Sequence, residues 1–437
     1  MALAWFPQNA LHTGVRPREV WGWAMYDFAN SGFTTVVITA VFNAYFVGVV
    51  AGGADWATLA WTLTLGVSSA LVMVTMPALG AHTDVHRCKK RWLLVSTVGC
   101  IAGTLTLALC GPEDLALAVA AVVAANLFFS WGESLIASFL PELARPEAMG
   151  RVSGWGWSLG YLGGMLALGL SLGYVLWAQA QGQSASQFVP VTMVITAAVY
   201  ALAAGFTFAW LRERGAAAGP TQPAIAAAPA RRMRLRETAA DLLQRPEHRS
   251  FLWLMGCACA YQAGISVVIT LAAVYAEQAM GFGQTQTMAL IFLVNIAAAL
   301  GAFAFGYFQD RIGHGQALSM TLWGWIGMIF LAVAAQGPAL FWVAAVLAGL
   351  CMGSSQSAGR AMAGLLAPSE RVAEFYGLWT FATRLAAIVG PITYGLVTWL
   401  TSGNHRMAIL STGLFFVVGL LLLRWVRLPA QPGATSP

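Results

Sequence analysis

Charged residues are scarce in this sequence. They make up 9% of its 437 residues, whereas 59% are hydrophobic. A soluble domain carries roughly 25% charged residues, so this composition cannot cover a water-facing surface and excludes a soluble globular protein. Lipid is then the main solvent. Each helix that crosses a bilayer needs about 20 mostly apolar residues, and the chain has room for about twelve of them.

Signatures of catalysis and metal binding are also lacking. The six cysteines show no metal-ligand spacing and indicate no disulfide framework, and the expected spans contain no histidine-based metal cluster. The string G-x-S-x-G occurs at 156–160 and 169–173, but both copies lie inside one long apolar run and not at the strand-to-helix turn that exposes a nucleophilic serine, so they do not indicate catalysis. We therefore predict no metal, no cofactor and no enzymatic activity. Because aromatic and basic residues do not alternate as they do in base-binding proteins, we attribute the net charge of +6 to loops and expect no nucleic-acid partner.

Two kinds of connection alternate between the apolar runs. Connections after the odd-numbered runs contain almost no Lys or Arg, whereas those after the even-numbered runs are basic, including one expected to start at Arg360. The positive-inside rule therefore predicts that both termini are cytoplasmic, in an inner (cytoplasmic) membrane crossed many times. We expect the membrane spans at 21–50, 57–80, 92–110, 115–139, 153–178, 188–211, 250–276, 286–308, 316–336, 339–359, 373–400 and 407–426.

One long connection separates the chain into two halves of six spans each. Its second part begins with several arginines, and apolar residues then recur at helical spacing, which predicts a basic helix on the membrane surface. A solvated charged linker is the alternative. The expected division is an N-terminal tail, a first half, a linker, a second half and a C-terminal tail, at 1–20, 21–211, 212–249, 250–427 and 428–437.

Two motifs occur once in each half. The first is G-x-x-x-D at Gly80 and Asp84 and again at Gly306 and Asp310, with an offset of 310 − 84 = 226. The second joins Glu147 to Gly154 and Glu370 to Gly377, with an offset of 377 − 154 = 223. Two independent motifs at nearly one offset indicate a six-helix unit used twice in the same orientation. Such duplicated bundles, with a site between them near the midplane, are typical of transporters.

The repeated motifs predict a latch at the cytoplasmic edge. Glycine allows two helices to approach closely, and an aspartate beside a loop can accept hydrogen bonds from helix N-terminal amides and pair with arginine. Such a latch would hold two helix ends together in one conformation and release them in another; a static cap is the alternative. The candidate latch residues are Gly80, Asp84, Arg87, Glu147, Arg151, Gly306, Asp310, Arg311 and Glu370.

The loop motif resembles that of the major facilitator superfamily. A narrower resemblance lies in Trp23-Ala-Met-Tyr-Asp-Phe-Ala-Asn-Ser31, which is similar to the opening of the vacuole-effluxer-like (autophagy-related amino-acid effluxer) family. Leu140-Pro-Glu-Leu143 and Glu374-Phe-Tyr-Gly377 resemble that family too. The resemblance implies an all-α integral membrane protein with twelve transmembrane helices in two six-helix bundles. It also implies movement of small molecules, with amino acids as the cargo of the fungal branch.

Three ionisable residues lie inside the expected spans, where a charge is costly and marks a candidate functional site. They are Asp27, Glu133 and Arg384. A carboxylate held away from water can exchange a proton near neutral pH, and it can also hold a substrate ammonium. Arg384 could bind a substrate carboxylate or neutralise Asp27. The alternative for Asp27 is a fixed pair with Arg384 or with another helix.

Uncharged polar residues complete the candidate site. Tyr26, Asn30 and Ser31 are close to Asp27 in the sequence, and the last two lie at i,i+3 and i,i+4 from it. In the second half, Ala263 stands where members of the resembled family carry an acid, and Gln262 is beside it. Gln356 lies 223 residues after Glu133 and is its repeat counterpart.

The sequence thus predicts a secondary transporter that moves a small organic solute, amino-acid-like by resemblance, by alternating access between the two halves. Efflux is the expected direction, proton coupling is left open, and a monomer in the lipid bilayer is expected. A non-transporting membrane sensor or assembly partner that reuses the fold is the alternative, because fold does not fix function.

Overall fold

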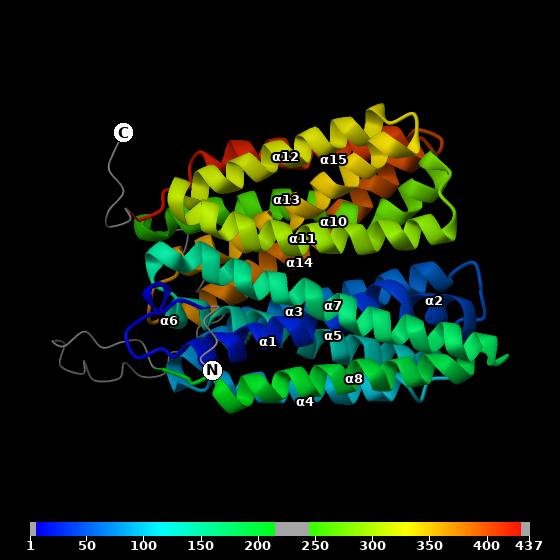
Figure 1. Cartoon of the computed structure of the whole chain (residues 1–437), viewed down its shortest axis with the longest axis horizontal. Coiled ribbons are helices and arrows are strands. Elements are labelled where there is room, and N and C mark those ends of the chain that lie inside the picture. Colours follow the sequence, from blue (N-terminus) through cyan, green and yellow to red (C-terminus); the bar gives the residue numbers. More distant parts are fainter. Residues whose placement is uncertain (1–5, 215–243, 430–437) are drawn as a thin grey trace.

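A computed structural model describes residues 6–214 and 244–429 (Figure 1). These residues form helices, because a backbone in lipid must satisfy its own hydrogen bonds and a helix does so within one segment. In Figure 1 the first half, from α1 to α8, lies below the second half, from α10 to α15. Each half has its own hydrophobic core.

The first half begins with a segment that contains two stretches of π-helix. The span runs through α1 (Pro17–Phe33), the π-helix η2 (Thr34–Ala40), α2 (Phe42–Tyr45) and the π-helix η3 (Phe46–Val50). The other elements of this half are α3 (Ala57–His86), α4 (Lys89–Leu107), α5 (Leu115–Ala137), α6 (Leu140–Leu143), η4 (Pro146–Ala148), α7 (Met149–Ala180) and α8 (Ala185–Trp210).

The second half follows the same order of long helices. A short 3-10 helix, η5 (Pro246–His248), leads into it. The long helices are α10 (Arg249–Met280), α11 (Gln284–Ile312), α12 (His314–Ala334), α13 (Pro338–Leu366), α14 (Val372–Leu400) and α15 (His405–Leu423). The surface helix predicted within 212–249 falls mostly on residues outside the described ranges.

Eleven helices of the described chain are long and apolar enough to cross a membrane. The twelfth long helix is α4, whose first three residues, Lys89, Lys90 and Arg91, are basic. Large apolar side chains such as Leu202, Leu300 and Trp399 are exposed on the outside of the bundle, as expected for a lipid-facing surface. The prediction of an all-α multi-pass membrane fold is confirmed.

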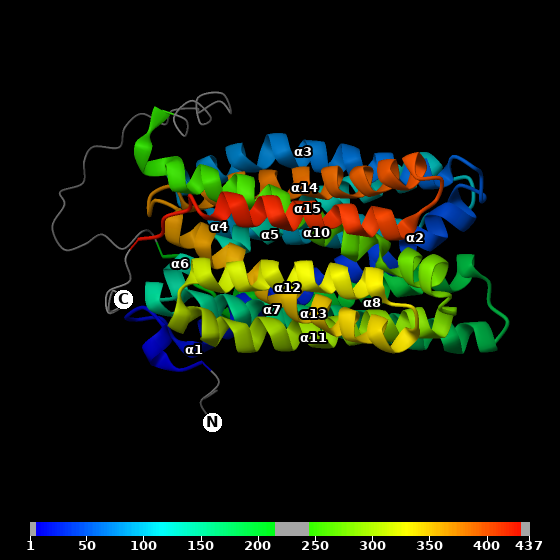
Figure 2. The ribbon, with the colours of Figure 1, turned by 90° about the horizontal axis from the view of Figure 1, so that it is seen from above.

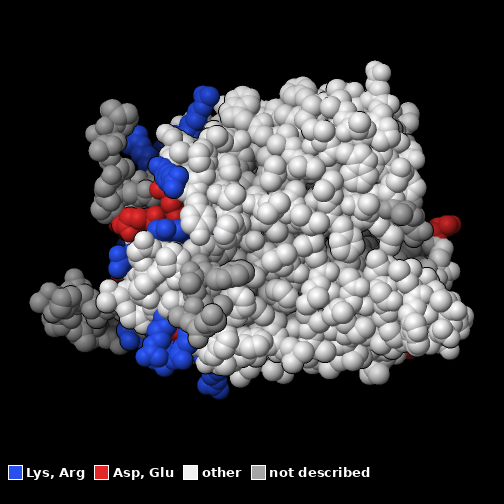
Figure 3. All heavy atoms as spheres, viewed as in Figure 1, with Lys and Arg blue, Asp and Glu red and all other residues white. Residues whose placement is uncertain are grey.

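On the face shown in Figure 3, the Lys and Arg side chains gather at one end of the molecule, and the only charged side chains visible at the other end are acidic. We call the end with the Lys and Arg side chains the basic end. It is where α3, α5 and α8 end and where α4, α7, α10 and α14 begin. Its cations include Arg87, Lys89, Lys90, Arg91, Arg212, Arg311 and Arg424.

The two halves meet through repeat-related pairs of helices. Helix α7 of the first half packs on α11 of the second, and α14 of the second half packs on α3 of the first. Figure 1 shows α7 beside α11, and Figure 2 shows α3 beside α14. These two seams flank the space between the halves and position the residues that line it.

Candidate functional site: a cavity between the two halves

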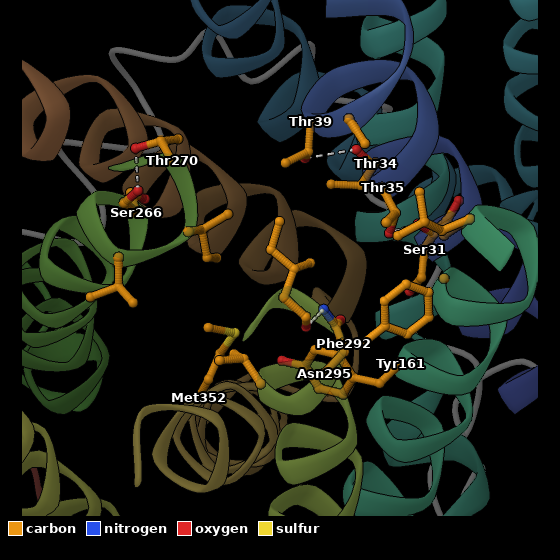
Figure 4. A pocket seen from close by; sticks show the side chains of 18 of the residues that line it. Ser31, Thr34, Thr35, Thr39, Tyr161, Ser266, Thr270, Phe292, Asn295 and Met352 are labelled. Carbon is orange, nitrogen blue, oxygen red and sulfur yellow. Dashed lines mark hydrogen bonds between the residues drawn. The ribbon is translucent and has the colours of Figure 1, made fainter. Parts of the chain in front are cut away.

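A cavity of about 1040 Å³ lies between the two halves. Helices α1, α5 and α7 line it on one side, and α10, α11, α13 and α14 on the other. It extends from Asp27 and Arg360 to the end opposite the basic end, where its lining residues Thr39 and Gln179 are exposed. In Figure 4, hydroxyl-bearing side chains of α1 and η2 face the opening from one side, and Ser266 and Thr270 of α10 lie across it.

A buried ion pair forms the part of the cavity nearest the basic end. Arg360 of α13 donates from Nη1 to Asp27 Oδ2 of α1 at 2.6 Å. Its Nε and Nη2 donate to the Oγ and the carbonyl oxygen of Ser153 on α7. The guanidinium also lies over the rings of Trp23 and Trp157, at 4.8 and 5.3 Å from their centroids. This network joins the two halves through one arginine whose nitrogens are all occupied.

Arg360 bears on two sequence-based expectations. We expected it to begin a basic connection, but α13 continues to Leu366 and Arg360 is buried. The reason is visible in the sequence, because apolar and small residues continue beyond Arg360 and the first helix breaker is Pro368. The alternative considered for Asp27 was a pair with Arg384 or with another helix, and the structure pairs it with Arg360 of α13.

The residues beside Asp27 divide between the cavity and the core. Asn30 and Ser31 line the cavity with Asp27. Tyr26 does not; it is fully buried and hydrogen-bonds Thr97 at 2.9 Å. Successive residues of a helix are about 100° apart, so Tyr26 faces the core of the first half while Asp27 faces the other half. Tyr26, predicted as a site residue, therefore lies behind the cavity and not in its lining.

Asn30 is held from behind by an aromatic side chain. The hydroxyl of Tyr200 on α8 donates to Asn30 Oδ1 at 2.6 Å, and the Asn30 side-chain nitrogen has no hydrogen-bond partner in the described part of the chain. Ser31 donates to the carbonyl oxygen of Asp27. The amide nitrogen of Asn30 is thus a buried donor available beside the cavity.

A second ion pair crosses the cavity, between α14 and α5. Arg384 donates from Nη2 to Glu133 Oε2 at 2.7 Å. Its guanidinium lies 5.8 Å from the centroid of the Phe129 ring. Glu133 and Arg384, both predicted as site residues, therefore pair with each other, and neither pairs with Asp27.

The two predicted glutamines also line the cavity. Gln356 of α13 accepts a hydrogen bond from the Tyr161 hydroxyl of α7 at 2.7 Å, so this contact also joins the halves. Tyr161 was not recognised from the sequence. Gln262 of α10 lines the cavity, whereas Ala263 is buried outside it.

The repeated aspartates close the basic end. Asp84 accepts hydrogen bonds from the backbone N–H groups of Ala373 and Glu374, at 3.1 and 2.9 Å. These two amides belong to the first turn of α14, so the first-half aspartate contacts the second half.

The second aspartate makes the same contact in the opposite direction. Asp310 accepts from the backbone N–H groups of Gly150 and Arg151 of α7, at 2.8 and 3.2 Å. The amide pairs at 150–151 and 373–374 are related by the offset 373 − 150 = 223. The sequence predicted this kind of contact for both aspartates.

Close approach at the basic end requires both repeated glycines. A Cβ added to Gly80 would collide with the backbone of Ala373, and one added to Gly306 would collide with the backbone of Gly150. Each glycine lies one helical turn before the aspartate of its motif, so it allows the seam to close where the aspartate reaches the neighbouring helix.

The charged neighbours of the aspartates differ in part from those expected. Arg151 pairs with Asp310 at 3.4 Å, and Lys89 lies 3.9 Å from Asp84. The other expected latch residues do not contact either aspartate in the described structure: Arg87, Arg311 and Glu370 are exposed, and Glu147 lies in η4. Arg87 ends α3 in a left-handed conformation, which directs the chain into α4 and its side chain away from Asp84.

Comparison with known proteins agrees with this architecture. The uncharacterized MFS-type transporter YxiO of Bacillus subtilis is 25% identical over 410 residues, which is 92% of this chain and 94% of that protein. The crystal structure of the human organic anion transporter MFSD10 superposes with a TM-score of 0.72 at 16% identity, over 93% of this chain and 99% of that one. A bacterial homologue of the iron transporter ferroportin in an outward-facing state gives 0.69 at 13% identity, over 93% and 98%.

Duplicated bundles, a cavity between them and these relatives define the class as a transporter of the major facilitator superfamily, and not an enzyme. The family model described as "Vacuole effluxer Atg22 like" matches residues 49–431. The chain belongs to that family, and the family resemblance stated from the sequence is confirmed.

Proposed function

We propose that this protein is a secondary active transporter that moves a small organic solute by alternating access. One observation carries the proposal: the cavity reaches one end of the bundle while two repeat-related aspartate contacts close the other. Because each aspartate contacts the opposite half, releasing both would let the halves separate at the basic end. The site would then be exposed alternately at the two ends.

The charge distribution supports an orientation. Lys and Arg gather at the basic end (Figure 3), and the positive-inside rule places such an end in the cytoplasm. We therefore propose that the protein lies in the inner membrane as a monomer, with both termini cytoplasmic and the cavity open away from the cytoplasm. Efflux as the physiological direction is supported by the name of the family, which describes effluxers.

An amino-acid-like cargo fits the chemistry of the cavity. Most lining residues are apolar or carry hydroxyls, and charges of both signs are present. A small molecule with an ammonium, a carboxylate and an apolar side chain can find a partner for each part. Proton coupling is proposed at Asp27, because a proton there would remove the negative charge that pairs with Arg360 of the other half.

The test is transport by the purified protein in liposomes. We expect a labelled amino acid to be driven by a pH gradient, and Asp27→Asn to lose this dependence because asparagine does not exchange a proton. Asp55→Asn is the matched control, since Asp55 is exposed and outside the cavity. Unchanged rate and pH dependence in Asp27→Asn would refute the coupling role. A protein that binds solutes but moves none across the bilayer would refute transport.

A further inference from the structure

Positive and negative charges in the cavity belong to different halves. In the described chain four charged side chains line it. The carboxylates, Asp27 and Glu133, come from α1 and α5 of the first half. The guanidinium groups, Arg360 and Arg384, come from α13 and α14 of the second half. A solute in the cavity therefore has an acidic wall on one side and a basic wall on the other.

The two arginines differ in how many of their donors are occupied. Arg360 uses Nε, Nη1 and Nη2 for bonds to Asp27 and Ser153, and its side chain is 7% exposed. Arg384 uses Nη2 alone, and its Nε has no hydrogen-bond partner in the described residues. A guanidinium offers five N–H donors in a planar fork, so Arg384 retains capacity for another acceptor.

Solvent reaches the second pair but scarcely the first. The side chain of Glu133 is 41% exposed and that of Arg384 is 19% exposed. A salt bridge that water reaches contributes little to stability. Replacing this pair by contacts to a ligand therefore costs little, whereas the buried pair would have to lose several bonds at once.

The repeat supplies an uncharged counterpart of the exposed pair. Moving from Arg384 by the repeat offset gives 384 − 223 = 161, and moving from Glu133 gives 133 + 223 = 356. Tyr161 and Gln356 are hydrogen-bonded to each other at 2.7 Å, as Arg384 and Glu133 are. The same contact between halves is thus made without charge on the other side of the cavity. Holding the halves together does not require an ion pair at this position, which leaves ligand recognition as the reason for the charges.

We propose that Glu133 and Arg384 are the charge subsite for a ligand that carries both an ammonium and a carboxylate. Arg384 binds the carboxylate through its fork, where two parallel N–H···O bonds can form, and Glu133 binds the ammonium. The ligand thereby exchanges one resident ion pair for two. Its cationic group points to the first half and its anionic group to the second. This inference rests on the proposed function and assigns its residues.

Binding of three related probes tests the assignment. The probes are phenylalanine, phenylalanine amide, which lacks the carboxylate, and 3-phenylpropanoate, which lacks the ammonium; their aromatic group suits a wall that includes Phe129, Phe292 and Phe341. We expect Glu133→Gln to weaken binding of phenylalanine and its amide about tenfold or more, and not to weaken binding of 3-phenylpropanoate, because Arg384 is then free of its resident partner. Arg384→Gln should weaken binding of phenylalanine and 3-phenylpropanoate and should not weaken binding of the amide.

A purely structural pair would give a different pattern. Equal loss for all three probes in either variant would overturn the assignment, as would a wild-type protein that binds none of them. Asp55→Asn is the matched control and should bind all three as the wild type does. If binding splits as expected but no probe crosses a liposome membrane, the subsite stands and the transport proposal fails. If another solute is transported and none of the probes binds, the transport proposal stands and the charge subsite is refuted.

Discussion

The two ion pairs that join the halves have the same chemistry and opposite surroundings. Asp27–Arg360 is buried, extended by Ser153 and enclosed by two tryptophan rings. Glu133–Arg384 consists of one hydrogen-bonded contact of 2.7 Å in a part of the cavity that water reaches. Burial and the number of hydrogen bonds that the arginine donates, not the charges themselves, therefore decide which pair a solute can displace.

The largest decrease in the free energy of unfolding should come from Arg360→Met. Removing one partner leaves the Asp27 charge buried without compensation, which typically costs about 3–5 kcal/mol. We expect the free energy of unfolding in detergent to fall by about that amount. Adding Asp27→Asn should restore much of the loss, because the double variant no longer buries a charge. If the free energy of unfolding of Arg360→Met fell by less than about 1 kcal/mol, the buried pair would contribute no more than the exposed pair, and the difference between them would be refuted.

The second-largest effect should come from weakening the aspartate contacts at the basic end. Asp310→Asn removes the charge from the acceptor of two hydrogen bonds to α7. A hydrogen bond to a charged group contributes about 1.5–3 kcal/mol, which is the upper limit of the loss for each bond. We expect the basic end to open more often. Spin labels placed at Arg87 and Arg311, which are exposed and belong to different halves, would report a larger mean distance. Cys88 and Cys259 would first be replaced by serine, since both are partly exposed.

Asp84→Asn is the matched variant of that experiment and should act in the same direction. Its effect sharpens the comparison between the repeats, because Lys89 beside Asp84 also pairs with Glu142 at 2.6 Å. An unchanged label distance in both variants would show that the aspartates are static caps.

A smaller effect is expected for Tyr161→Phe. It deletes the neutral contact to Gln356, and an ordinary hydrogen bond contributes about 0.5–1.5 kcal/mol. Thermal unfolding should show a modest decrease, with probe binding by Glu133 and Arg384 retained. Loss of the discrimination between phenylalanine and its amide in this variant would mean that the neutral pair, too, recognises charge.

The smallest change in stability should follow Glu133→Gln. Because its side chain is 41% exposed, we expect the free energy of unfolding to change by about 1 kcal/mol or less, measured as for Arg360→Met. A loss comparable to that of Arg360→Met would contradict the exchangeable role and indicate a structural pair.

The fold and the basic-end contacts could be predicted because they depend on patterns that the sequence displays directly. Apolar runs indicate spans, and the G-x-x-x-D repeat located Asp84 and Asp310 before any coordinates. The pairing inside the cavity could not be predicted in the same way. It depends on which helices face each other, and Arg360 was assigned to a connection because a charge normally marks a span end. The apolar run from Ala361 to Leu366 was the signal that could have corrected this.

The first span shows a second limit of periodicity. Up to Phe33 the helix is regular, and Asp27, Asn30 and Ser31 face the cavity as α-helical spacing predicts. Beyond it, η2 and η3 have the wider turns of a π-helix, so an α-helical pattern no longer identifies the cavity face. Such irregular turns are frequent at functional sites, and Thr34, Thr35 and Thr39 of η2 do line the cavity.

The partition of charge between the halves has a consequence for the unloaded protein. Lone carboxylates on one wall and lone guanidinium groups on the other would make closure around an empty space unfavourable. Glu133 and Arg384 neutralise each other when they are paired, so under the proposed alternating access the protein would be able to reorient without a solute. We therefore expect net uptake or release in addition to one-for-one exchange.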